Sequence, residues 1–177
     1  CATLPPAPIV FTFDDGWKSQ IEVALPALLR YRIPATFFVL PTFDGKEDRH
    51  LTIDDFRTLV DAGMSVQSHT LNHANLPVLL SWNPGAAQAE VVESRQILEK
   101  IGGVDYFAYP FGALDPATIE LVTNAGYLAA VSTRFGCIHF RQDLMKLSRV
   151  AVNPSATASL VIASLAEARN HDELRLR

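Results

Sequence analysis

The sequence predicts an α/β fold in which helices cover a parallel sheet, built as a single domain over residues 1–177. A length of 177 residues suits one hydrophobic core. The composition, 49% hydrophobic and 19% charged, is that of a folded globular chain. Short apolar runs also alternate with stretches of helical periodicity, which is typical of either an open doubly wound sheet or a barrel.

The strands are predicted by runs rich in apolar, β-branched and aromatic residues. In chain order these runs lie at residues 9–13, 35–40, 64–68, 105–112, 127–132 and 146–152. Their nearly continuous apolar character suits strands that are buried on both faces of a parallel sheet. Residues 1–8 are proline-rich and are expected to form an extended segment that leads into the first strand.

The helices are predicted by apolar residues at helical spacing, with capping residues at their ends. In chain order they lie at residues 19–32, 52–63, 84–102, 115–126 and 155–170. Ser19, Thr52 and Asp115 are expected N-caps, and Pro26 is expected to kink the first helix.

Charge and hydropathy exclude several partners. The net charge is −4 and the fifteen Lys and Arg residues are scattered, so we expect no nucleic-acid binding. No apolar stretch is long enough to predict a transmembrane segment, and the sequence identifies no protein partner. Cys1 and Cys137 are too few for a disulfide scaffold. Cys1 is either a linker residue or, as a minor alternative, a lipid attachment point.

Two histidines follow the third predicted strand. His69 and His73 in "SHTLNH" are four residues apart, so on a helical turn both imidazoles would project from one face. Together with a carboxylate they would form a catalytic metal site with a position open for water. Surface or capping histidines are the alternative interpretation.

Two acidic residues, Asp14 and Asp15, follow the first predicted strand in "FTFDDG". A bound metal ion would lower the cost of placing two carboxylates side by side, so one could be a ligand and the other a base. In an extended segment, neighbouring side chains point to opposite sides, which would separate the two roles. An ordinary Asp-Asp-Gly turn is the alternative.

Three segments together identify a family resemblance. "TFDDG" (12–16), "SHTLNH" (68–73) and "YPFG" (109–112) resemble, in order and separation, the first three motifs of the polysaccharide deacetylases. This family is also called carbohydrate esterase family four, or the NodB-homology domain. The resemblance covers nearly the whole chain and implies a distorted (β/α) barrel with fewer than eight repeats.

The resemblance also implies residue roles. Asp14 would be the general base, and Asp15, His69 and His73 would hold a divalent metal ion, most often Zn²⁺, with Co²⁺ or Ni²⁺ tolerated. The backbone N–H of Phe111 would help to stabilise the oxyanion.

Aromatic residues near the motifs are candidates for substrate binding. Tyr109 and Pro110 belong to the motif that would line the groove, and the residues that could stack on sugar rings are Trp17, Tyr109, Phe111 and Trp82. Packing in the core or at its rim is the alternative for these side chains.

The sequence departs from the family pattern at two positions. Many members have an arginine where this chain has Ala108, so the arginine that braces the catalytic aspartate is expected to be missing. The family's Leu-x-His, whose histidine is the general acid, is replaced by Leu147–Arg149, and arginine is not a proton donor at neutral pH. His139 is the candidate substitute acid, with a structural histidine as the alternative.

Both departures resemble a subgroup that acts on partly acetylated poly-β-1,6-N-acetylglucosamine. The expected function is therefore metal-dependent N-deacetylation of such a polysaccharide or its oligosaccharides outside the cytoplasm, in the periplasm, at the cell surface or after secretion. O-acetyl xylan esterase and chitin or peptidoglycan deacetylase are the enzymatic alternatives. A non-catalytic carbohydrate-binding pseudoenzyme is the alternative of another class.

Overall fold

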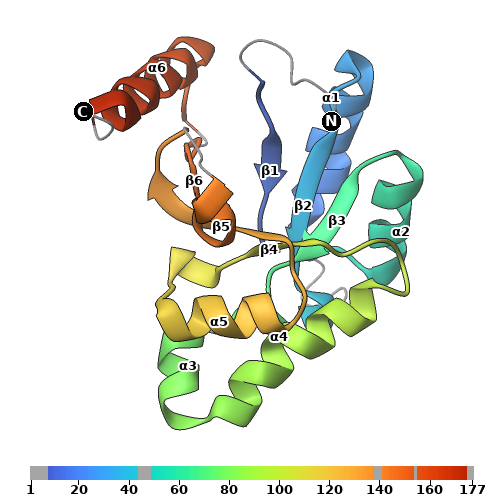
Figure 1. Ribbon diagram of the computed structural model, residues 1–177. Helices are drawn as coiled ribbons and strands as arrows, with labels where there is room; N and C mark the ends of the chain where they lie inside the picture. The colour runs from blue at the N-terminus through green and yellow to red at the C-terminus, as the bar shows by residue number, and fades with distance from the viewer. Residues whose placement is uncertain (1–7, 44–48, 138–140, 154, 175–177) are drawn as a thin grey trace.

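A six-stranded sheet forms the centre of the fold, and every neighbouring pair of strands in it is parallel. The computed structural model describes residues 8–43, 49–137, 141–153 and 155–174. The strands are β1 (Phe11–Phe13), β2 (Ala35–Val39), β3 (Ser65–Ser68), β4 (Tyr106–Ala108), β5 (Ala129–Phe135) and β6 (Leu147–Arg149). Their order in the sheet equals their order in the chain, with β1 and β6 at the two edges, as Figure 1 shows. The sheet is therefore a part-barrel of six strands, which confirms the expected fold class.

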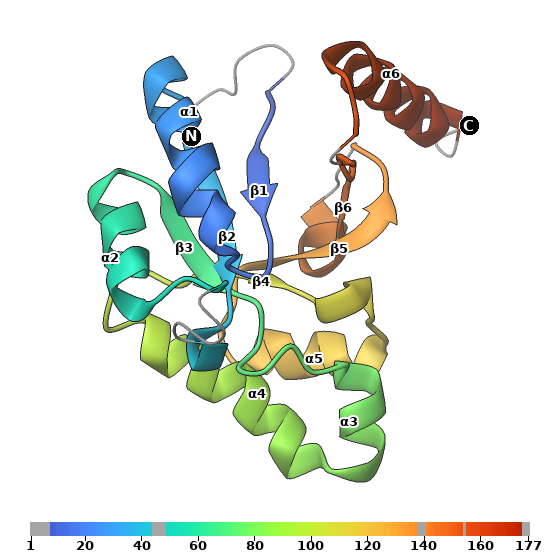
Figure 2. The same cartoon turned by 180° about the vertical axis from the view of Figure 1, so that it is seen from behind.

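Helices follow most of the strands. They are α1 (Leu25–Tyr31), α2 (Ile53–Asp61), α3 (Leu76–Trp82), α4 (Pro84–Leu98), α5 (Pro116–Asn124) and α6 (Ala158–Leu174). Figures 1 and 2 show α1 and α2 beside β2 and β3, α4 and α5 together across the lower part of the sheet, and α6 apart, beyond β6. Within the described ranges, none of these helices combines the length and apolar character needed to cross a membrane.

The helix ends confirm two of the three expected caps. Thr52 and Asp115 each form a capping box, in which the cap and the residue three positions later exchange hydrogen bonds. Ser19 stands at the expected N-cap position, but its side chain makes no capping hydrogen bond. A π-helical segment, Gln20–Ala24, precedes α1, and the change to α-helical geometry comes next to Pro26, which has no N–H to donate.

The core lies between the sheet and the helices. Its largest fully buried side chains include Phe37, Phe38, Phe56, Phe107, Tyr109, Leu51, Leu59, Leu76 and Leu98. Phe37 on β2 also stacks on Phe13 of β1, with ring centroids 4.9 Å apart. This packing fixes the ends of the strands from which the loops of the site begin.

Gly112, in the loop after β4, packs closely against Thr133. Its φ is +65°, and an added Cβ would lie 2.0 Å from Thr133 Oγ1 and 2.7 Å from Thr133 N. A left-handed backbone alone costs a non-glycine residue about 1–2 kcal/mol. Because of the added clash with Thr133, Gly112→Ala is expected to lower the free energy of unfolding by more than this. Gly103→Ala is the matched control, since its Cβ would meet nothing within 4 Å. Equal urea-unfolding losses in the two variants would contradict this account.

Candidate active site

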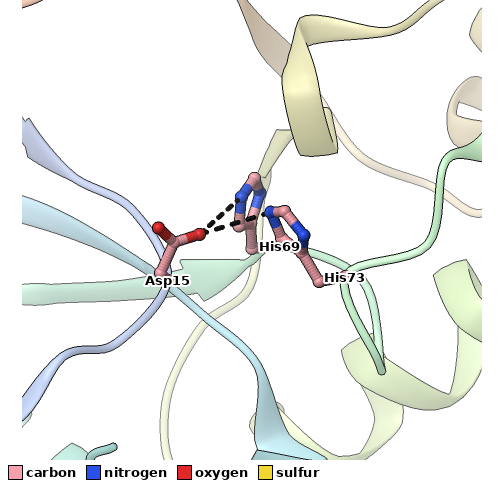
Figure 3. A group of neighbouring side chains, drawn as sticks. All are labelled: Asp15, His69 and His73. Atoms are coloured by element: carbon pink, nitrogen blue, oxygen red, sulfur yellow. Dashed lines mark ion pairs between the residues drawn. The ribbon is translucent and has the colours of Figure 1, made fainter.

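The site lies where the strands of the parallel sheet end. Asp14 and Asp15 directly follow β1, His69 directly follows β3, and Arg149 is the last residue of β6. Since the carboxyl ends of parallel strands meet at one rim, the adjacent Asp14 and Asp15 become neighbours of His69 and Arg149, which are far away in sequence. Figure 3 shows the Asp15 carboxylate facing the imidazoles of His69 and His73.

The three predicted metal ligands are brought together. Asp15 Oδ1 lies 3.4 Å from His69 Nε2 and 3.3 Å from His73 Nε2, and the three ligand atoms are all within 4.8 Å of one another. Ligand atoms around a tetrahedral zinc ion, with bonds of about 2.0–2.1 Å, are about 3.3 Å apart. The donor set and its spacing therefore fit one divalent metal ion.

The orientation of His69 is fixed by the backbone. Its ring is buried, and Nδ1 lies 2.7 Å from the carbonyl oxygen of Ala108. A carbonyl can only accept, so Nδ1 carries the hydrogen and Nε2 is directed at Asp15. Nε2 is thus the ring atom that a metal ion beside Asp15 can take as a ligand.

Asp15 is held in its charged form. Hydrogen bonds from the side chains of His69 and then His73 lower the pKa of Asp15 far below its ordinary value, although partial burial raises it. Asp15 is therefore an anion at neutral pH, which is the form that binds a cation.

The histidine segment is a loop, so the expected helical turn was wrong. Residues 69–75 are neither helix nor strand, and Thr70 and His73 have positive φ values of 69° and 59°. The two left-handed residues bend the chain so that both imidazoles face Asp15. The two imidazoles therefore lie on the same side, as the sequence predicted, but a bent loop rather than a helical turn places them there.

Glu90 on α4 holds this loop in place, and sequence reasoning missed it. Its carboxylate accepts hydrogen bonds from Leu71 N at 3.0 Å, Asn72 N at 2.7 Å and Asn72 Nδ2 at 2.8 Å, while its side chain is buried. Thr42 adds a hydrogen bond from its hydroxyl to the carbonyl of Leu71. A signal was available, since Glu90 is the one charged residue among the buried positions Ala87, Glu90, Val91, Ser94 and Leu98 of α4.

Asp14 is paired with Arg149, which corrects the expectation that a bracing arginine is missing. Arg149 donates from Nη1 to Asp14 Oδ1 at 2.8 Å and from Nη2 to Oδ2 at 2.6 Å. Its Nη1 also donates to Thr12 Oγ1, and its Nε donates to the carbonyl of Ser132. The brace is thus supplied by β6, and the residue that replaces the family's acid holds the candidate base.

The two acidic side chains diverge because of a turn. Asp15 has a φ of 73°, so the segment is not extended there as the sequence predicted. Asp14 faces Arg149 while Asp15 faces the histidines. The separation of the two carboxylates is confirmed, with a left-handed residue as its cause.

Two predicted residues lie at the surface next to the predicted metal ligands. Trp17 is 42% exposed, and its Nε1 donates to Asp15 Oδ2 at 3.1 Å. Phe111 has a φ of 60° and is 64% exposed, and its ring meets that of His73 edge-on at 4.5 Å. Both aromatic side chains therefore remain accessible beside the ligand cluster.

The remaining predicted residues lie elsewhere. Tyr109 and Pro110 are buried, and the Tyr109 hydroxyl donates to the carbonyl of Met145. Burial raises the pKa of Tyr109 above its ordinary value, as expected for a phenol in the core. The Tyr109 ring thus packs inside the fold. His139 and Cys1 lie outside the described residues.

A part-barrel of six parallel strands with a candidate metal site at its rim is the NodB-like architecture of solved deacetylase structures. A family model described as polysaccharide deacetylase matches residues 2–130, and the chain belongs to this family. It is 30% identical over 164 residues to a chitooligosaccharide deacetylase of Sinorhizobium fredii, covering 90% of this chain and 68% of that protein. YxkH of Bacillus subtilis is 29% identical over 153 residues, 85% of this chain. The chain spans only about half of that relative's length, 53%.

Solved structures agree with this assignment. The deacetylase PplD of Streptococcus pyogenes, solved with acetate, superposes with a TM-score of 0.82 at 26% identity, covering 92% of this chain and 73% of that chain. IcaB of Ammonifex degensii superposes with a TM-score of 0.79 at 26% identity, covering 92% and 75%. The fold is therefore shared along nearly all of the chain.

Arg149→Ala is expected to lower the rate of acetate release on the order of 10²-fold, because misplacement of a reacting group by about 1 Å costs that much. Arg149→Lys should recover less than the full rate, since one ammonium cannot bridge both carboxylate oxygens. Added guanidinium ion should partly restore Arg149→Ala. Arg57→Ala, which removes an exposed arginine paired with Asp54 on α2, is the control. Full activity of Arg149→Ala would contradict the bracing role.

Proposed function

We propose that the protein removes N-acetyl groups from N-acetylglucosamine-containing polysaccharide, releasing acetate and leaving free amines. The observation that carries the proposal is the Asp15, His69 and His73 cluster, with its 3.3 and 3.4 Å spacings, beside an arginine-braced Asp14. A metal ion in a set of one carboxylate and two imidazoles has open positions for a substrate oxygen and water. Zn²⁺ is the proposed ion, with Co²⁺ or Ni²⁺ as substitutes.

The metal ion would supply polarisation of the acetyl carbonyl and activation of a water molecule. Asp14, held by Arg149, would take the proton as the water oxygen bonds to the acetyl carbon. The N–H of Phe111 would donate to the oxygen on which negative charge develops. The C–N bond then breaks, and the departing amine takes a proton.

The proton donor for the amine differs from the one that the family resemblance implies. Arg149 occupies the position of the family's acid, yet its N–H groups bind Asp14, Thr12 and Ser132, and arginine retains its proton at neutral pH. Asp14 would hold the proton that it takes from the water in the first step. It could then donate this proton to the departing amine, so that one group acts first as base and then as acid. His139 remains the proposed alternative donor.

The polymer that we favour is poly-β-1,6-N-acetylglucosamine. A poly-β-1,6-N-acetyl-D-glucosamine N-deacetylase of Staphylococcus epidermidis is 22% identical over 169 residues, 89% of this chain and 58% of that protein. Action outside the cytoplasm is proposed with this substrate. Trp17 and Phe111, both exposed beside the ligands, are the proposed contacts to sugar rings.

The decisive experiment measures acetate release from N-acetylglucosamine oligomers with added Zn²⁺ or Co²⁺. Asp14→Asn is expected to abolish release while one equivalent of metal still binds, since it removes the base and keeps the ligands. His69→Ala and His73→Ala are expected to lose both metal and activity. Metal binding at one equivalent with no acetate from any acetylated glycan would instead favour a carbohydrate-binding protein without activity.

A panel of substrates tests the choice of polymer. We expect the highest kcat/KM with β-1,6-linked oligomers, compared with β-1,4-linked chitin oligomers, peptidoglycan fragments and acetylated xylan. The products are separated by mass after each reaction. Acetate from xylan alone would replace the proposal with O-acetyl esterase activity, and preference for β-1,4 linkages would replace it with chitin or peptidoglycan deacetylation.

A further inference from the structure

We propose that Trp17 is a positioning residue for the metal centre, which it serves by fixing the second oxygen of Asp15 and so leaving the first oxygen for the ion. This inference rests on the metal site of the proposed function. The two Asp15 oxygens have separate partners, since Oδ1 faces His69 and His73 and Oδ2 accepts from Trp17 Nε1 at 3.1 Å. The indole N–H therefore defines which oxygen is the ligand atom.

Trp17 is itself held by a second chain segment. Lys18 N donates to the Arg49 carbonyl at 2.6 Å, Leu51 N donates to the Gly16 carbonyl at 2.8 Å, and Trp17 and His50 form an antiparallel bridge between these bonds. Residues 16–18 and 49–51 thus make a short two-stranded ladder beside the site. These backbone hydrogen bonds fix the position of the Trp17 backbone and so the direction of its indole ring.

Ring stacking fixes the indole plane. His50 stacks on Trp17 with centroids 4.4 Å apart and planes 29° apart. Phe43 stacks on His50 with centroids 5.0 Å apart and planes 20° apart. His50 belongs to none of the family motifs, and its place between two rings gives it a supporting role.

The consequence concerns metal affinity. A carboxylate that is free to rotate presents either oxygen, or both, and must be ordered when the ion binds. Hydrogen bonds to the non-ligating atoms of metal ligands prevent this, and their removal typically weakens metal binding by about 10–100-fold. Trp17→Phe keeps an aromatic ring for His50 to stack on, although a smaller one, and removes the N–H donor to Asp15.

The test compares Co²⁺ dissociation constants, measured by competition with a chromophoric chelator. Trp17→Phe is expected to weaken Co²⁺ binding by about 10–100-fold. Trp82→Phe is the matched control, because Trp82 is exposed on α3, and its dissociation constant should equal that of the wild type. The melting temperature in excess chelator reports whether each metal-free variant is folded.

Variants at His50 separate stacking from any role of its nitrogens. His50→Phe preserves a flat ring between Trp17 and Phe43 and should bind Co²⁺ nearly as tightly as the wild type. His50→Ala removes the support and should weaken binding, with less effect than Trp17→Phe. Equal weakening in His50→Phe and His50→Ala would overturn the stacking role.

Two outcomes distinguish this inference from the proposed function. Unchanged Co²⁺ affinity in a folded Trp17→Phe variant would overturn the role of Trp17 and leave the deacetylase proposal standing. A wild-type protein that binds no Co²⁺ would overturn the metal site and, with it, both proposals. Reduced affinity in Trp17→Phe but not in Trp82→Phe supports the inference, whatever the rate of acetate release.

Discussion

The ion pair between Arg149 and Asp14 is the contact on which the geometry of the site depends most. It joins β6 to the loop after β1, the two edges of the sheet, across 135 positions of sequence. Two parallel N–H···O bonds restrict rotation of the carboxylate far more than a single contact would. The first carboxylate of the site is therefore positioned by the last strand of the part-barrel.

Left-handed backbone at Asp15, His73 and Phe111 is the second constraint. Their φ values are 73°, 59° and 60°, and such conformations cost about 1–3 kcal/mol each for non-glycine residues. The surrounding hydrogen bonds offset this cost, above all the three that Glu90 accepts from Leu71 and Asn72. These hydrogen bonds restrict the loops that carry the site, which is what precise positioning of a reaction requires.

The architecture was largely predictable from local patterns, and the details of the loops were not. Alternating apolar runs and helical periods predicted six strands and most of the helices. α3 was missed because its seven residues provide only two turns of periodicity. The spacing of His69 and His73 predicted their meeting but suggested a helical turn, because spacing alone cannot distinguish a helix from a loop bent by positive φ values.

The contacts between distant segments were the hardest to predict. Residue type showed that Arg149 cannot donate a proton, yet nothing local to β6 shows that its guanidinium reaches Asp14. The pairing of residues 16–18 with 49–51 is equally invisible, since neither segment has the length of a strand. Glu90 was the exception, because a charge on the buried side of a helix is a local signal of a specific partner.

The position of Arg149 also constrains which residue can stand at position 108 on β4. One guanidinium already occupies both oxygens of Asp14, and Ala108, where the family resemblance implies an arginine, is fully buried. Arginines at both positions would leave one buried positive charge without an anion, which is strongly unfavourable. Alanine at position 108 therefore keeps a second positive charge out of a buried site where Arg149 already pairs with Asp14.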